Sequence, residues 1–333
     1  MRSNSKQGFV FSRKSKPKPS VAYNTYWKFA VERQNIFFKR LKGISYPWTT
    51  DRILNDHKFT NVYRATDRVS QYLIKNIIYK EEQEPVEVFF RILLFKIFNR
   101  ISTWEFLEAE LGQVSFKSYS FKRYDKLLSG LLQQKSAIYS AAYIMASGRS
   151  AFGYERKHQN HLKLIELMIK DKLPYKLQAC VSMMDAYNLL LTYPTIGEFL
   201  AYQYVSDINY SSLTNFSEME FVKAGPGAKD GILKCFSDFG DYSFEDIIRM
   251  VAESQEQEFH RLHLNFEDLW GRSLQLIDCQ NVFCEVDKYS RLAHPEIIGY
   301  SNRTRIKQKY KFMHNEPINF VFPLKWNINH LIT

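Results

Sequence analysis

Glycine and proline, the residues that most often interrupt regular structure, are scarce in this chain, with 13 and 10 copies among 333 residues. Aromatic residues make up 16% of the chain, including 26 Phe and 21 Tyr. So little glycine is not typical of a nucleotide-binding α/β sheet, which needs glycine loops, or of a turn-rich all-β fold. The composition therefore predicts an all-α protein, and the length allows one or two domains with a sizeable core.

Apolar residues recur at helical spacing along most of the chain. We expect helices over residues 26–41, 62–79, 86–99, 104–111, 119–134, 137–147, 158–170, 173–191 and 195–204. Thr49 or Thr50 is expected to cap a helix with Asp51 in its first turn, and Thr103 is expected to cap the helix that follows it. Near the C-terminus, NFVFPLKW (residues 319–326) is expected to be extended.

The charge balance indicates a polyanionic partner. Lys and Arg number 46 against 35 Asp and Glu, which gives a formal net charge of +11. An excess of this size usually meets nucleic acid, although a basic protein without such a partner is the alternative. Residues 1–20 hold basic charges and no acidic ones, and we interpret them as a flexible basic tail.

Several classes of protein are excluded by what the sequence lacks. No apolar run is long enough for a transmembrane helix, and the basic N-terminus has no apolar core of a secretory signal. Four Cys in so long a chain suggest reduced thiols and a cytoplasmic location. The pairs His158/His161 and His260/His263 lack a nearby third ligand, so we expect no metal and no other cofactor.

Residues 221–236 (FVKAGPGAKDGILKCF) have the layout of a helix-hairpin-helix turn. Gly225 and Gly227 permit a close backbone approach, and the N–H groups that open the following helix can bind one DNA phosphate. Lys223 and Lys229 would add positive charge. An ordinary helix–helix turn is the alternative interpretation.

Residues 274–291 (LQLIDCQNVFCEVDKYSR) combine acidic and amide side chains with apolar ones. If this stretch is helical, Asp278, Asn281 and Glu285 share one face. A carboxylate there can activate water or stabilise a sugar cation at C1′, and the amide can read an extruded base. A solvated polar face is the alternative. In residues 59–73, Arg64, Asp67 and Arg68 can form either a structural ion-pair network or a phosphate clamp.

Three of these stretches, in this order, resemble motifs of one known group. Residues 47–54 and 59–69 resemble its PWTxDxIL and FxNVRREDDRV patterns, residues 220–232 resemble DFVxAGPGAxxGI, and residues 280–289 resemble QNxLCEFxKY. Tyr63, Ala65 and Thr66 depart from the RREDD core. The chain is thereby similar, over about residues 24–292, to the alpha-glutamyl/putrescinyl thymine pyrophosphorylase-like superfamily. This group includes the helical domain of phage 5-hydroxymethyluracil DNA kinases, amino acid:DNA transferases and anti-phage DNA glycosylases.

The resemblance implies an all-helical, DNA-glycosylase-like fold with a helix-hairpin-helix, acting on modified bases in duplex DNA. Kinase members of the group carry an extra P-loop domain, and this chain contains no GxxxxGKS or GxxxxGKT motif. A glycosylase or a transferase is therefore expected. We expect three regions, namely a tail at 1–20, the helical domain at 21–292 and an extension at 293–333.

The resemblance also implies roles for individual residues. Asp278 is the expected catalytic carboxylate, with Glu285 and Asp287 as rivals, and Lys229 occupies the position of a Schiff-base lysine. The expected DNA-binding residues are Gly225, Gly227, Lys223, Lys229, Arg64 and Arg68. The expected base pocket consists of Gln280, Asn281 and Glu32.

The leading functional hypothesis is a monomeric DNA glycosylase that excises a bulky modified pyrimidine, such as glucosylated 5-hydroxymethylcytosine, from phage DNA in anti-phage defence. The alternative enzyme is a transferase that attaches an amino acid or polyamine to an activated 5-hydroxymethyluracil. A third hypothesis is a module that only binds modified DNA. The reaction products distinguish the two enzymes, because a transferase leaves a heavier base in the DNA and a glycosylase releases a free base.

Overall fold

The computed structural model describes residues 15–312 and 319–332, and it confirms the all-α expectation. The only sheet among these residues has two short antiparallel strands, β1 (Lys18–Pro19) and β2 (Phe236–Asp238). Most of the predicted basic tail, residues 1–14, lies outside the described residues. In the described ranges, no helix has both the length and the apolar character that crossing a membrane requires.

Helices follow one another along nearly the whole chain, most of them joined by short loops. They are α1 (Val21–Leu41), α2 (Arg52–Asp56), η1 (Arg64–Thr66), α3 (Arg68–Leu73), η2 (Ile74–Ile78), α4 (Pro85–Phe98), α5 (Ile101–Leu111), α6 (Phe121–Gln133), α7 (Arg149–Phe152), α8 (Lys157–Lys170), α9 (Leu173–Ala179), α10 (Met183–Leu191), α11 (Glu198–Ile208), α12 (Pro226–Cys235), α13 (Phe244–Arg261), α14 (Leu276–Ala293), η3 (Leu324–Trp326) and η4 (Asn329–Leu331).

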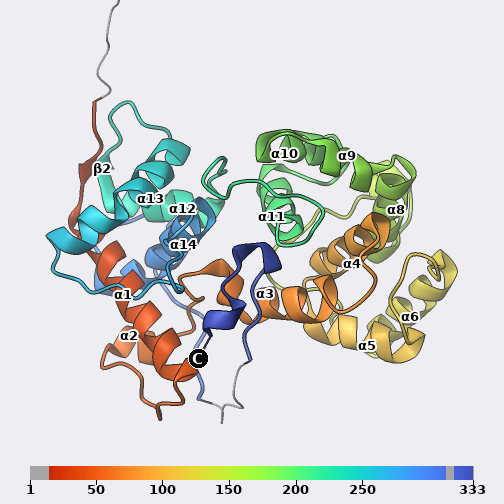
Figure 1. The fold of residues 1–333 in the computed structure, drawn as a ribbon, viewed down its shortest axis with the longest axis horizontal. Helices are drawn as coiled ribbons and strands as arrows, with labels where there is room; N and C mark the ends of the chain where they lie inside the picture. Colours follow the sequence, from red (N-terminus) through yellow and green to blue (C-terminus); the bar gives the residue numbers. More distant parts are fainter. Residues whose placement is uncertain (1–14, 313–318, 333) are drawn as a thin grey trace, which may run out of the picture.

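The helices form two halves that differ in their position along the chain (Figure 1). One half contains α4 to α11, the middle of the sequence, where α4 packs against α8, α9 and α11. The other half brings α1 and α2 together with α12, α13 and α14, so that an early and a late part of the described sequence share one unit. Helix α3 lies between the two halves.

Helices α12 and α14 approach each other very closely, and this contact organises the second half. A Cβ atom on Gly231 would lie 2.0 Å from the backbone oxygen of Phe283, so only glycine fits at this crossing. The Phe283 ring lies 4.5 Å from the ring of Tyr26 on α1, between their centroids. The three helices therefore share one buried contact, which holds the exposed face of α14 in place.

Several predicted boundaries are wrong, each for a local reason. Residues 137–147 form a loop and not a helix, and Tyr143 in this loop has a positive φ of 58°. The loop nevertheless buries Ile138 and Met145, which accounts for its apolar spacing. The predicted helix 173–191 is two helices, since the backbone turns extended at Cys180 and Ser182 caps α10. Apolar spacing alone does not reveal such breaks.

The predicted caps at the start of α2 and α5 are also wrong. Asp51 itself caps α2, and its Oδ1 accepts the N–H groups of Ile53 and Leu54. The Thr49 hydroxyl instead accepts the N–H of Asp51, one step earlier. Helix α5 begins at Ile101, so Thr103 lies inside its first turn and not at its cap.

Candidate functional site

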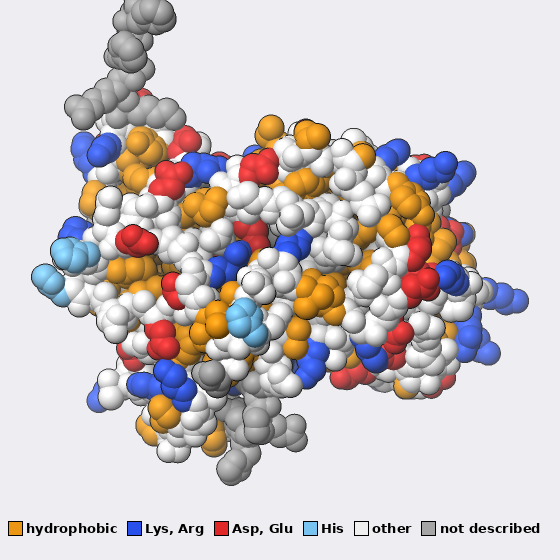
Figure 2. Space-filling model, in the orientation of Figure 1, with side chains coloured by type: hydrophobic (Ala, Val, Ile, Leu, Met, Phe, Trp, Pro, Cys, Tyr) orange, Lys and Arg blue, Asp and Glu red, His pale blue; other side chains and the backbone are white. Residues whose placement is uncertain are grey.

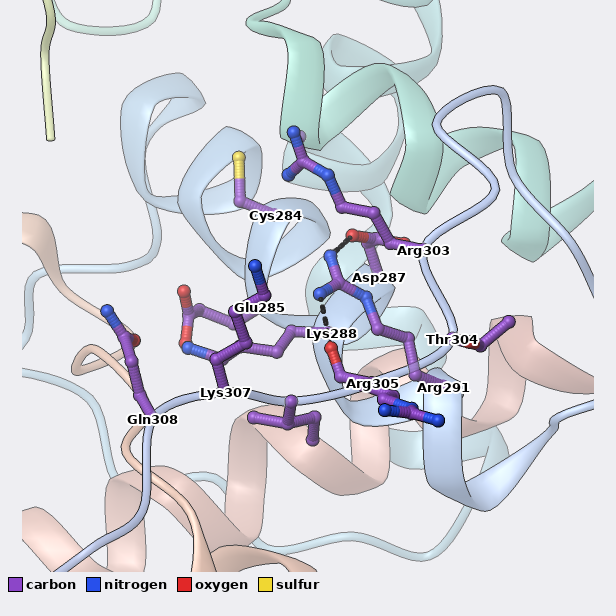
Figure 3. Close-up of a pocket in the computed structure, with 12 residues that line it drawn as sticks. Cys284, Glu285, Asp287, Lys288, Arg291, Arg303, Thr304, Arg305, Lys307 and Gln308 are labelled. Atoms are coloured by element: carbon purple, nitrogen blue, oxygen red, sulfur yellow. Dashed lines mark hydrogen bonds and ion pairs between the residues drawn. The ribbon is translucent and has the colours of Figure 1, made fainter. Parts of the chain in front are cut away.

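A cavity of about 650 Å³ lies between α14 and the extended segment at residues 303–308 (Figure 3). Helix α14 lines one side, the extended segment lines the other, and Gly227 contributes the start of α12. We call this the basic cavity, and its lining residues are Gly227, Cys284, Glu285, Asp287, Lys288, Arg291, Arg303, Thr304, Arg305, Ile306, Lys307 and Gln308.

Positive charge is in excess in the basic cavity. Its two carboxylates are already paired: the Glu285 Oε2 lies 2.6 Å from Lys288 Nζ, and Asp287 lies between Lys234 and Arg291. The remaining cations, Arg303, Arg305 and Lys307, are exposed, and no carboxylate in the described part of the chain is within ion-pair distance of them. They are thus free to bind an anion.

Hydrogen bonds from three directions hold the segment of residues 57–61 beside this cavity. The Thr60 N–H donates to Glu285 Oε2 at 3.0 Å, and Asn281 Nδ2 donates to the Asn61 carbonyl at 2.8 Å. Further along, the Lys58 N–H donates to the Gln308 carbonyl at 3.1 Å. The segment therefore ties α14 to the C-terminal extension.

A second cavity, of about 490 Å³, is lined in part by residues 57–61. Its lining is rich in aromatic and polar side chains that come from α1, the loop before α2, and Tyr310. We call it the aromatic pocket, and its lining residues are Arg33, Ile36, Arg40, Tyr46, Trp48, Thr49, Leu54, Asn55, His57, Lys58, Phe59, Asn61, Asp67, Arg68 and Tyr310.

Four ionisable groups of the aromatic pocket have a shifted pKa, and burial is the largest cause for each of them, namely Arg33, His57, Asp67 and Tyr310. Burial raises the pKa of Asp67 to about 7, although the Asn61 N–H donates to its Oδ1 at 2.8 Å. Burial lowers the pKa of Arg33 to about 10, which leaves the guanidinium charged near neutral pH. A cation and a carboxyl group of this kind, held together in a cavity, are typical of a ligand site.

The predicted residues of α14 divide between the cavity and the core. Glu285 and Asp287 line the basic cavity. Asp278 is 3% exposed and closes the start of α14, where its Oδ2 accepts the Gln275 N–H and its Oδ1 accepts the Arg64 N–H at 2.8 Å. Burial, reinforced by Glu218, raises the pKa of Asp278 to about 7.

The predicted base-pocket residues do not share one cavity. Asn281 donates to the Asn61 carbonyl, whereas Gln280 is buried beside Gly225. Glu32 accepts a hydrogen bond from the Thr49 hydroxyl, and Thr49 lines the aromatic pocket. Their expected role in base recognition stays a prediction.

The predicted DNA-binding residues are likewise spread out. Gly225 caps α12, and Gly227 lines the basic cavity. The Lys229 Nζ lies 5.6 Å from the centre of the Phe244 ring, and the Lys223 Nζ lies 3.4 Å from Glu198 Oε2. Neither lysine lines the basic cavity or the aromatic pocket.

The two arginines predicted to bind DNA have different environments. Arg68 is exposed and lines the aromatic pocket. Arg64 is 4% exposed, and its Nη1 lies 2.8 Å from Asp207 Oδ1.

Sequence reasoning missed the contribution of residues 303–308. A signal was present, because NRTRIKQK alternates basic with other residues, and an extended chain with this spacing points its basic side chains to one side. The segment lies beyond the stretch that resembles known motifs, so the resemblance assigns it no role.

The comparisons with known proteins agree with the helical fold. A family model described as "5-hmdU DNA kinase, helical domain" matches residues 20–299. The chain belongs to this family. A similar curated protein is the 5-hmdU DNA kinase of Bacillus phage SP10, which is 26% identical over 287 residues. The matched region covers 80% of this chain and 44% of that kinase, and no solved structure matches the chain.

Membership of this helical-domain family corrects the leading functional hypothesis. The prediction of a DNA glycosylase is wrong, because both the family and the phage relative are described as kinases, which transfer a group and do not hydrolyse a glycosidic bond. The transferase alternative is closer. The error has a general cause, since a helical DNA-binding fold does not specify the reaction that it supports.

Proposed function

We propose that this chain is the DNA-binding unit of an enzyme that transfers a group onto 5-hydroxymethyluracil in duplex DNA. The observation that carries the proposal is the basic cavity, in which Arg303, Arg305 and Lys307 present unpaired positive charge along one segment. The phage relative is named a 5-hmdU DNA kinase, so the phosphoryl group is the first candidate for the transferred group.

Phosphate is the anion that this cavity suits best. Exposed Lys and Arg side chains release counterions from DNA when they contact phosphates, which drives binding without reading the base sequence. Gly227 lies in the first turn of α12, where the helix dipole favours a negative charge. Residues 209–225, which precede α12, are not helical, so the proposal uses the start of α12 alone and not the helix-hairpin-helix predicted at residues 221–236.

DNA binding and its salt dependence test the proposal. We expect the triple variant Arg303→Gln/Arg305→Gln/Lys307→Gln to weaken binding to a 5-hydroxymethyluracil duplex, and to reduce the slope of log K against log salt by about 3. The matched control removes three exposed cations from α6, Lys122→Gln/Arg123→Gln/Lys126→Gln, which changes the net charge equally. Equal losses in the two variants, measured by fluorescence anisotropy, would show that the basic cavity has no special role.

Nucleoside mass spectrometry tests the transfer step. In phosphoryl transfer, the 5-hydroxymethyl oxygen attacks the terminal phosphorus of a nucleoside triphosphate, the diphosphate leaves, and the hydroxyl proton passes to a base. The product is a nucleoside heavier by one phosphoryl group. An amino acid or polyamine transferred to activated 5-hydroxymethyluracil would give a different added mass, and release of a free base would contradict both.

A further inference from the structure

The aromatic pocket carries an inference about which base the protein selects, and this inference rests on the proposed function. We propose that the pocket receives a uracil-type pyrimidine extruded from the duplex, with its flat face against the aromatic side chains and its Watson–Crick edge toward Arg33 and Asp67. The volume of about 490 Å³ is within the range of small-ligand sites, which is roughly 300–1,000 Å³.

The aromatic walls of the pocket are held rigidly. The Trp48 indole N–H donates to the Ile44 carbonyl at 2.6 Å, and the Arg40 guanidinium lies 5.2 Å from the Trp48 ring. Phe59 packs against Phe29 with ring centroids 5.4 Å apart. Aromatic faces held in place favour base stacking, because little side-chain freedom is lost on binding.

Arg33 supplies a hydrogen-bond donor that the fold leaves unused. Its side chain is 8% exposed, its Nε donates to the Thr60 carbonyl at 3.0 Å, and its Nη2 donates to Asn61 Oδ1 at 2.6 Å. Its Nη1 is buried and has no partner among the described residues. A buried N–H group without a partner is costly, and a carbonyl oxygen of a bound base would satisfy it.

Asp67 completes a pattern that matches uracil and not cytosine. Its Oδ1 is occupied by the Asn61 N–H at 2.8 Å, which leaves Oδ2 to accept a further hydrogen bond. Uracil presents a carbonyl, an N3–H donor and a second carbonyl along its edge, which pairs with a donor from Arg33 and an acceptor from Asp67. Cytosine has an unprotonated N3, so above the pKa of Asp67, about 7, it would place a lone pair against the ionised carboxylate.

The pocket lies where an extruded nucleotide could reach it from the basic cavity. Lys288, which lines the basic cavity, has its Nζ 4.6 Å from the ring of Phe59, which lines the aromatic pocket. Lys58 and Arg68 are exposed and also line the pocket, so they can contact flanking phosphates. One DNA strand could therefore place its backbone on the basic side and one base on the aromatic side.

The test is run at a pH well above 7, where Asp67 is ionised. It compares two duplexes that carry 5-hydroxymethyluracil or 5-hydroxymethylcytosine opposite an abasic analogue, so that neither base must break a pair. We expect the wild-type protein to prefer the uracil duplex by about tenfold, the change that one well-placed hydrogen bond produces. Asp67→Asn should abolish or invert this preference, because its carbonyl can keep the Asn61 bond while its NH₂ group faces the base. Tyr310→Ala should weaken binding of the uracil duplex, whereas Tyr300→Ala, at a tyrosine that is 81% exposed and outside the pocket, should not.

The outcomes separate this inference from the proposed function. If Asp67→Asn keeps the wild-type preference and Tyr310→Ala keeps the wild-type affinity, while the basic-cavity triple variant loses affinity for both duplexes, the base is read elsewhere and only the inference fails. If the wild-type protein binds the two duplexes equally well, the inference likewise fails and the proposed function stands. If the wild-type protein binds neither duplex, the proposed function fails as well. Circular dichroism checks that each variant is folded. If Asp67→Asn does not fold, the affinity of Tyr310→Ala for the uracil duplex tests the inference instead.

Discussion

At the scale of single residues, the most consequential group is a buried cluster of three charges. Asp207 is fully buried, and its two oxygens lie 2.8 Å from Arg64 Nη1 and 3.2 Å from Lys96 Nζ. Burial alone would raise the pKa of Asp207, but the two cations hold it below its ordinary value. The cluster joins α11, α4 and η1. Arg64 therefore belongs to a sequence motif and also links elements of the core.

We predict that Asp207→Asn destabilises the protein by about 3–5 kcal/mol, because it leaves two buried cations without a counter-charge. The control is Glu108→Gln, which removes the partner of Lys80 in a pair that water reaches, and it should cost at most about 1 kcal/mol. Urea unfolding measures both. Similar values for the two variants would mean that the buried cluster contributes no more than a surface pair.

At the scale of elements, the contact between α12 and α14 determines the shape of the basic cavity. Gly231 allows α12 to approach the Phe283 backbone, and Gly227 would place a Cβ atom 3.2 Å from Cys284 Sγ. The glycines of the GPGAKDG stretch thus serve helix packing, and Gly227 does so at the edge of the cavity. From the sequence alone, these glycines are equally compatible with a close approach between two helices and with a close approach of the backbone to DNA.

We predict that Gly231→Ala costs more than about 1–3 kcal/mol, the usual range for overpacking, because the obstructing atom belongs to the backbone and cannot rotate away. Gly130→Ala on α6 is the control: no atom lies within 4 Å of the added carbon, and relief of the glycine entropy should stabilise the helix by about 0.5–1 kcal/mol. Thermal unfolding of the two variants should shift in opposite directions. A small effect of Gly231→Ala would show that α12 can move without cost.

At the scale of the whole molecule, the two halves differ in how far apart their contacts lie in the sequence. The stretches of chain that separate α4 from its partners α8, α9 and α11 are shorter than those that separate α1 from α12 and α14. Tyr26 and Phe283, whose ring centroids lie 4.5 Å apart, come from opposite ends of the chain. The half that holds the basic cavity must therefore close a long loop before it gains its contacts.

We predict that the amides of α4 and α8 are protected before those of α1 and α14 during refolding. Contacts that are local in sequence form sooner because they lose less chain entropy. Pulse-labelled hydrogen exchange with mass spectrometry measures the order. Protection of α1 as early as α4 would contradict the prediction and would place the chain ends in the folding nucleus.

Much of the candidate site could not be predicted from the sequence. The motif around Gln280 and Cys284 did lead to α14, which lines the basic cavity. Residues 303–308 and Tyr310 were missed, because they belong to the site only through contacts such as that of Lys58 with Gln308. Whether Glu285, Asp287 or Lys229 takes part in chemistry stays a prediction.

The sequence by itself determined the helical class, the excess of positive charge and the family motifs, because helical spacing, charge and residue order are properties of the chain read along its length. Only the tertiary structure decided that Arg64 is buried beside Asp207, that Asp278 accepts the Gln275 N–H at the start of α14, and that residues 303–308 complete the basic cavity. The physical reason is that burial and the pairing of charges depend on neighbours from distant parts of the chain. Those neighbours meet only when the helices pack.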